Sequence, residues 1–136
     1  LTNQEILLEN EGIATRDFIF VEDICRGLML CALKGVEGDV YNIGSGVETS
    51  IADLAQKIIQ IADSKSKLTM APKRAWDTSG KRFASVVKSQ EKLGFTAGVA
   101  LQEGLEKTVA WTKENLAVIQ RCIEKHEKHL AYYQNK

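Results

Sequence analysis

Two segments of the chain carry side chains that could bind an anionic ligand. Arg16 begins an apolar run, and residues 72–82 (PKRAWDTSGKR) contain Arg74, Trp76 and Asp77. An arginine fork binds phosphate oxygens in pairs, an aromatic ring covers a base or sugar, and a carboxylate accepts hydrogen bonds from ribose hydroxyls. Two separate arginine-containing segments that close over a diphosphate would therefore make a coherent binding site.

Both segments also have simpler interpretations. Arg16 and the following Asp17 are typical of a surface ion pair. The second segment adds Lys73, Lys81 and Arg82, and loops rich in lysine and arginine are common on solvated surfaces. The residue types alone leave these alternatives open.

A glycine-rich stretch, NIGSGVETS (residues 42–50), has the outline of a turn that places a dinucleotide pyrophosphate on a helix N-terminus. Its third glycine position holds Thr49, and no acidic residue lies about 20 residues further on at the end of a following strand, as ribose recognition would require. We therefore interpret it as a turn between a strand and a helix.

Two further motifs are interpreted as structural. Tyr132 and Lys136 have the Tyr-x-x-x-Lys spacing of a dehydrogenase acid/base pair, but they stand at the very end of the chain, where ends fray. His126 and His129 are three residues apart on a helical pattern without a third ligand nearby, so no metal site is predicted.

Strand-like and helix-like segments alternate, which is typical of the α/β or α+β class. Strands are expected at 6–9, 17–21, 40–43 and 68–70; helices are expected at 22–34, 51–62, up to 93, and from 101 onward. Ser50 should cap the second helix, with Asp53 completing a capping box. The last helical stretch is either one helix or two joined near Asn115.

Composition excludes several classes of protein. Among the 136 residues, lysine plus arginine and aspartate plus glutamate number 18 each, so no positive field favours nucleic acid or a membrane surface. Three cysteines without Cys-x-x-Cys spacing indicate a reducing compartment, and we expect the cytoplasm. No apolar run approaches membrane-spanning length. Because the chain begins with Leu1, we expect it to be a piece of a longer protein.

In order along the chain, the motifs NEGIATRDFIFVEDICRG, GDVYNIGSG, TSIADLAQKI, KRAWD, LGF and LQEGLEKTVAWTKEN resemble the C-terminal portion of an extended short-chain dehydrogenase/reductase. The similar group is the NAD-dependent nucleotide-sugar epimerases and dehydratases, which include UDP-glucose 4-epimerase. The resemblance implies an α/β fold: the C-terminal part of a Rossmann-type enzyme, including its small substrate-binding subdomain, over residues 1–136.

The resemblance also assigns roles to residues. It implies that Arg16, Arg74 and Asp77 hold the diphosphate and ribose of a sugar nucleotide. Trp76 stands where the epimerases carry glycine, which leaves the base and sugar open. NAD and the catalytic Tyr-x-x-x-Lys would belong to an N-terminal part that precedes this chain, so the chain alone should be inactive.

The expected function is therefore substrate binding within an NAD(P)-dependent epimerase or dehydratase. Such an enzyme acts at the hexose C4 through a 4-keto intermediate, and the resemblance implies that it is a homodimer. The alternative is a non-catalytic interaction module that uses its long C-terminal helix to bind a partner.

Overall fold

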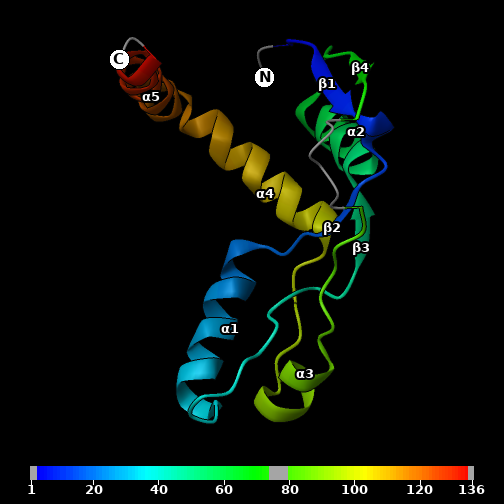
Figure 1. The fold of residues 1–136 in the computed structure, drawn as a ribbon, viewed down its shortest axis with the longest axis vertical. Helices are drawn as coiled ribbons and strands as arrows, with labels where there is room; N and C mark the ends of the chain where they lie inside the picture. The colour runs from blue at the N-terminus through cyan, green and yellow to red at the C-terminus, as the bar shows by residue number, and fades with distance from the viewer. Residues whose placement is uncertain (1–2, 74–79, 135–136) are drawn as a thin grey trace.

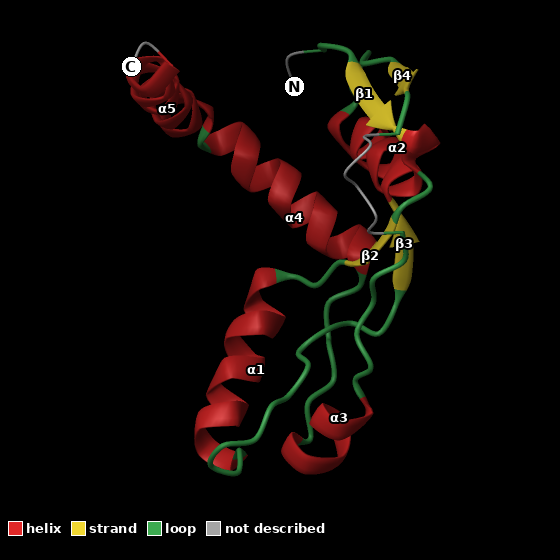
Figure 2. Cartoon of the chain, viewed as in Figure 1, coloured by secondary structure: helices red, strands yellow, loops and turns green. Residues whose placement is uncertain are grey.

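The computed structural model describes residues 3–73 and 80–134, without the side chains of residues 128–134. It is a mixed α/β structure, as the sequence predicts (Figures 1 and 2). In chain order the elements are β1 (Ile6–Glu9), the 3-10 turn η1 (Asn10–Gly12), β2 (Thr15–Asp17), α1 (Val21–Lys34), β3 (Glu48–Ser50), α2 (Ile51–Ala62), β4 (Leu68–Ala71), α3 (Val87–Leu93), α4 (Leu101–Glu114) and α5 (Leu116–Gln134).

Two small sheets connect segments that are distant in sequence. β1 pairs in parallel with β4, and β2 pairs antiparallel with β3. The segment 80–82 lies along the other edge of β2: the amide of Thr15 donates to the carbonyl of Gly80, and the amide of Arg82 donates to the carbonyl of Thr15, both at 3.2 Å. β2 therefore holds two separate segments, one on each edge.

The elements are spread out rather than packed around one centre (Figure 1). α1 and α3 lie at one end, while β1, β4 and α2 lie at the other. α4 contacts α2, and α5 continues from its far end. The buried apolar side chains of the described residues form a small set: Leu8, Ala55, Leu93 and Phe95. Large apolar side chains remain exposed on several elements.

Helix ends follow the sequence closely. α2 begins after Ser50, whose hydroxyl oxygen accepts a 3.0 Å hydrogen bond from the amide of Asp53, so the predicted cap is confirmed. α3 ends at Gly94, which adopts the left-handed conformation that favours glycine (φ 67°). Of the two alternatives for the last helical stretch, the structure has two helices that break at Asn115.

Two expected strands differ from the structure. The strand expected at 17–21 ends at Asp17, and Val21 already begins α1. Residues 40–43 form no strand, and the side chain of Val40 is 77% exposed. A strand needs a neighbour for its backbone hydrogen bonds, and none lies beside these residues in the described part of the chain.

We expect Ser50→Ala to lower the free energy of unfolding by about 1 kcal/mol, because one amide at the start of α2 loses its acceptor. Ser50→Thr retains an acceptor oxygen and should stay within about 0.5 kcal/mol of the native chain. Urea denaturation followed by circular dichroism measures both. Equal stability of the alanine variant and the native chain would contradict the cap.

Candidate functional site

Of the predicted ligand-binding residues, the structure places Arg16. It lies in β2, and its guanidinium donates hydrogen bonds to the carbonyl oxygens of Thr15 (2.6 Å) and Gly80 (3.1 Å). Arg74, Trp76 and Asp77 lie outside the described residues. Gly80 is the first described residue after positions 74–79, so Arg16 contacts the chain directly after that segment.

A shallow, open pocket of about 550 Å³ lies beside Arg16. It is lined by Arg16, Asp17, Lys81, Arg82, Phe83 and Ala84. The three basic side chains make one wall positive, although Lys81 also lies 3.6 Å from the carboxylate of Glu48. The ring of Phe83 is 56% exposed beside them. This combination suits an anionic ligand that carries a flat or apolar group.

Lys81, Arg82 and Phe83 were not among the predicted site residues. The sequence shows Lys81 and Arg82 near the arginine-containing loop, but their pairing with β2 is a long-range contact. No spacing rule connects positions 15 and 81. Phe83 gives no sequence signal beyond being an aromatic residue after two basic ones.

Asp17 has a structural role rather than a ligand-binding one. Its carboxylate accepts hydrogen bonds from the amides of Ser45 and Gly46 (both 2.9 Å), from the amide of Ala84 (3.2 Å) and from the hydroxyl of Ser45 (2.5 Å). Burial raises the pKa of Asp17, but these hydrogen bonds outweigh burial and the pKa lies below its ordinary value. Asp17 thus joins β2, the glycine-rich loop and the segment at Ala84.

The hydrogen bonds to Asp17 and the backbone conformation of the loop explain the glycines in residues 42–50. A Cβ on Gly44 would lie 2.6 Å from Oδ2 of Asp17, so only glycine fits, and Gly46 has φ 73°. The amides of Ser45 and Gly46, which a pyrophosphate would use, donate hydrogen bonds to Asp17 instead. The interpretation as a simple strand-to-helix turn also needs correction, because β3 lies between this loop and α2.

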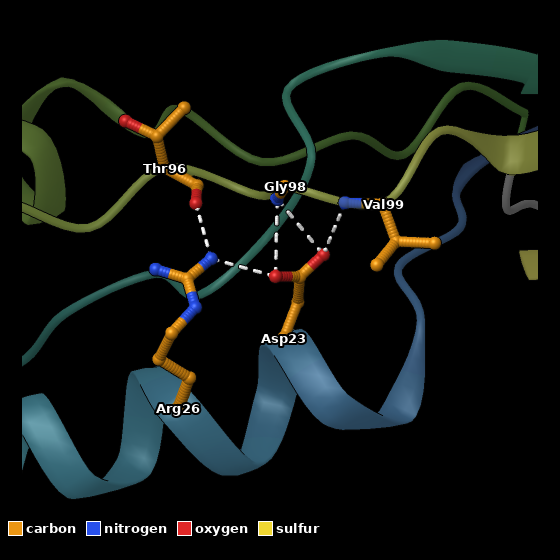
Figure 3. Close-up of polar contacts among 5 residues, drawn as sticks. All are labelled: Asp23, Arg26, Thr96, Gly98 and Val99. Atoms are coloured by element: carbon orange, nitrogen blue, oxygen red, sulfur yellow. Dashed lines mark hydrogen bonds and ion pairs between the residues drawn. The ribbon is translucent and has the colours of Figure 1, made fainter.

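A second carboxylate anchors α1 (Figure 3). Asp23, which is 3% exposed, accepts hydrogen bonds from the amides of Gly98 (3.0 Å) and Val99 (2.9 Å) and from the guanidinium of Arg26 (2.6 Å). Arg26 also donates to the carbonyl of Thr96. Burial raises the pKa of Asp23, but the hydrogen bonds from Arg26, Gly98 and Val99 outweigh burial and lower it.

Among the described side chains, the histidine pair and the Tyr-x-x-x-Lys spacing near the C-terminus add no site. Within residues 3–73 and 80–134, no group of three histidine, cysteine, aspartate or glutamate side chains could hold a metal ion. The side chains of His129 and Tyr132, and all of Lys136, lie outside what the structure describes. In the same part of the chain, no helix has the length and apolar character needed to cross a membrane.

Comparison with known proteins shows which enzymes this chain is similar to. Residues 1–44 match the model of the NAD dependent epimerase/dehydratase family. The dTDP-glucose 4,6-dehydratase of Streptomyces niveus is 31% identical over 86% of this chain and 35% of its own length. Solved structures agree. The WbmF enzyme of Bordetella bronchiseptica, in complex with NAD+ and UDP, is 52% identical over 96% of this chain, with a TM-score of 0.82.

The UDP-glucose 4-epimerase of Thermotoga maritima, solved with UDP-glucose, is 30% identical over 84% of this chain, with a TM-score of 0.78. The predicted resemblance is therefore confirmed: the chain is similar to NAD-dependent nucleotide-sugar epimerases and dehydratases along most of its length, and its α/β fold matches theirs. The chain spans 38% of the WbmF structure and 36% of the Thermotoga one, a little over a third of each.

We expect Asp23→Asn to lower the free energy of unfolding by about 2 kcal/mol at neutral pH, because the amides of Gly98 and Val99 lose the charged acceptor that the buried Asp23 provides. The folded-state pKa of Asp23 lies below the ordinary 3.8. The stabilisation by the Asp23 carboxylate is therefore complete well above pH 3.8, and it is lost as the pH falls through the pKa that Asp23 has in the folded chain. The stability difference between the native chain and the variant should shrink in acid.

The neighbouring Glu22 is exposed in the same first turn of α1, so Glu22→Gln is the matched control and should change stability by less than about 0.5 kcal/mol. Chemical denaturation at a series of pH values measures both variants. A difference for Asp23→Asn that stays constant down to strongly acidic pH would contradict the assigned role of its charge.

Proposed function

We propose that this chain is the substrate-binding part of an NAD(P)-dependent nucleotide-sugar epimerase or dehydratase. The observation that carries the proposal is the contact between Arg16 and Gly80. It places a guanidinium from one predicted substrate segment at the end of the other, above a pocket with two more basic side chains. The ligands named for the relatives, UDP for WbmF and UDP-glucose for the Thermotoga enzyme, carry the diphosphate that such a pocket suits.

Within this proposal the residues of the chain bind and orient the substrate. Arg16 and Arg74 hold the diphosphate, and Asp77 accepts hydrogen bonds from the ribose. Lys81 and Arg82 extend the positive wall, which favours approach of a dianionic ligand. Trp76 gives the loop a bulky ring, which selects the base or sugar by shape.

The nicotinamide cofactor belongs to the part of the parent enzyme outside this chain. In support of this, the amides of Ser45 and Gly46, in the loop whose outline suits a pyrophosphate, donate hydrogen bonds to Asp17 instead. When bound to the parent, NAD would accept a hydride from the hexose C4 and leave a 4-keto sugar. The role of this chain is to fix that carbon in place through the diphosphate, in an enzyme that we propose to be a homodimer.

We expect Arg16→Ala and Arg74→Ala, each made in the longer parent protein, to weaken UDP-sugar binding by about ten-fold or more. Each removes a charge-assisted contact worth about 1.5–3 kcal/mol. Isothermal titration calorimetry with UDP-glucose and with UDP measures the dissociation constants.

Arg121→Ala is the matched control, because Arg121 lies exposed on α5, where it bonds the carbonyl of Ala117. It should leave both dissociation constants unchanged. If all three variants bind with native affinity, the pocket does not hold the diphosphate. If the native parent binds neither UDP nor UDP-glucose, the non-catalytic interaction module becomes the better account of the chain.

A further inference from the structure

Helix α5 (Leu116–Gln134) lies beyond the last motif of the family resemblance, which ends at Asn115. The helix α4 ends at the same point, and α5 begins directly after it. In Figure 1, α5 continues from the far end of α4 and lies apart from the other labelled elements. The surface of α5 is therefore an addition to the part of the chain that the family motifs cover.

The sequence of α5 repeats apolar residues with a period of seven. Leu116 and Ile123 stand at the first position of successive heptads, and Ile119 stands at the fourth. Those are the two positions that face a partner helix in a coiled coil. Leu130 and Tyr133 continue the repeat in the sequence, so steps of three and four residues alternate from 116 to 133. This regular alternation is typical of a helix that pairs with another helix.

The described part of this face is accessible. We define the α5 seam as the described residues at the first and fourth heptad positions: Leu116, Ile119, Ile123 and His126. Leu116 and Ile123 are each 45% exposed. His126 is exposed as well, and Ile119 is half-buried. A helix in a protein gains most of its stability by burying its apolar face, so the α5 seam needs a cover.

The charges of α5 are separated from the α5 seam. Arg121, Glu124 and Lys125 stand at the sixth, second and third heptad positions, which are the positions that face solvent in a pair of helices. Among the charged residues of the described side chains of α5, only Glu127 borders the seam, at the fifth position. A face with no charge along its centre has no like-charge repulsion against a copy of itself.

We propose that the α5 seam pairs with the α5 seam of a second copy of this chain, as a two-helix coiled coil. The repeat is self-complementary, because equal heptads on both helices let the side chains of one seam fit between those of the other. A two-fold axis uses the same surface on both copies, which is the commonest symmetry of assemblies of identical chains. The nineteen residues of α5 extend for about 28 Å along this contact.

This contact is independent of the proposed function, because no residue of α5 belongs to the candidate site. It is also separate from the homodimer that the resemblance implies, since no family motif includes α5. His126 places a polar ring at a fourth position of the seam. A polar residue there fixes the register of the two helices and lowers the stability of the pair.

Cys122 provides a direct test, because it is exposed on α5 at the seventh heptad position, next to the α5 seam. The longer parent protein is treated with bis-maleimidohexane, and cross-linked peptides are identified by mass spectrometry. A cross-link between Cys122 and Cys122 can come only from two copies. We expect this cross-link in the native parent.

A charge in the α5 seam should separate the helices. Ile123→Asp is expected to lower the yield of the Cys122 cross-link by about ten-fold or more, because pairing would bury two unpaired carboxylates. Ala117→Asp is the matched control, since it adds the same charge at an exposed second heptad position and should leave the yield unchanged. Circular dichroism checks that both variants keep their helices.

Replacing the polar residue of the seam should have the opposite effect. His126→Leu is expected to lower the protein concentration at which the cross-link forms, because an apolar residue at the fourth position favours pairing. A variant that merely disturbed the fold would not increase the yield.

Two outcomes would overturn the proposal. One is the absence of a Cys122 cross-link in the native parent, which together with slow alkylation of Cys122 would assign the seam to another part of the parent. The other is an equal yield in the native parent and in Ile123→Asp, which would show that the cross-link arises from random collision.

Discussion

The arrangement of the candidate site depends on the carboxylate of Asp17. It accepts four hydrogen bonds, three of them from backbone amides, and these connect β2 to the glycine-rich loop and to Ala84. Successive side chains of a strand point to opposite sides. Asp17 can therefore hold the framework together while Arg16, one residue earlier, contacts Gly80. Arg16 and Asp17 thus have separate roles, and they do not act primarily as an ion pair with each other.

Asp23 repeats this arrangement at α1, where it fixes Gly98 and Val99 to the first helical turn. The helix dipole favours acidic residues such as Glu22 and Asp23 in the first turn, but the hydrogen bonds of Asp23 are a larger reason for its place there. The buried apolar core of the described residues is small, so the carboxylates of Asp17 and Asp23, each of which binds several amides, determine where the long connecting segments run.

Local features were predictable and long-range ones were not. The cap at Ser50, the glycine that ends α3 and the extent of α1 follow from neighbouring residues, because helix ends are determined within a few positions. The glycine-rich loop was recognised as a turn, but its partner Asp17 lies 28 and 29 residues earlier. The strand expected at 40–43 failed for a different reason. Its sequence is right for a strand, but strand formation also needs a neighbouring edge.

For the site, the resemblance supplied Arg16, and the structure added the pairing of residues 80–82 with β2. That pairing explains how two arginine-containing segments far apart in sequence can converge on one ligand. Lys81, Arg82 and Phe83 enter the site only through it. The roles of Arg74, Trp76 and Asp77 remain a prediction from the resemblance.

The most direct test of this account is a crystal structure of the longer parent protein with UDP bound. The account predicts a diphosphate oxygen within about 3 Å of the Arg16 guanidinium, with Asp17 still bound to the amides of Ser45 and Gly46. UDP bound at a place that the guanidinium of Arg16 cannot reach would contradict it.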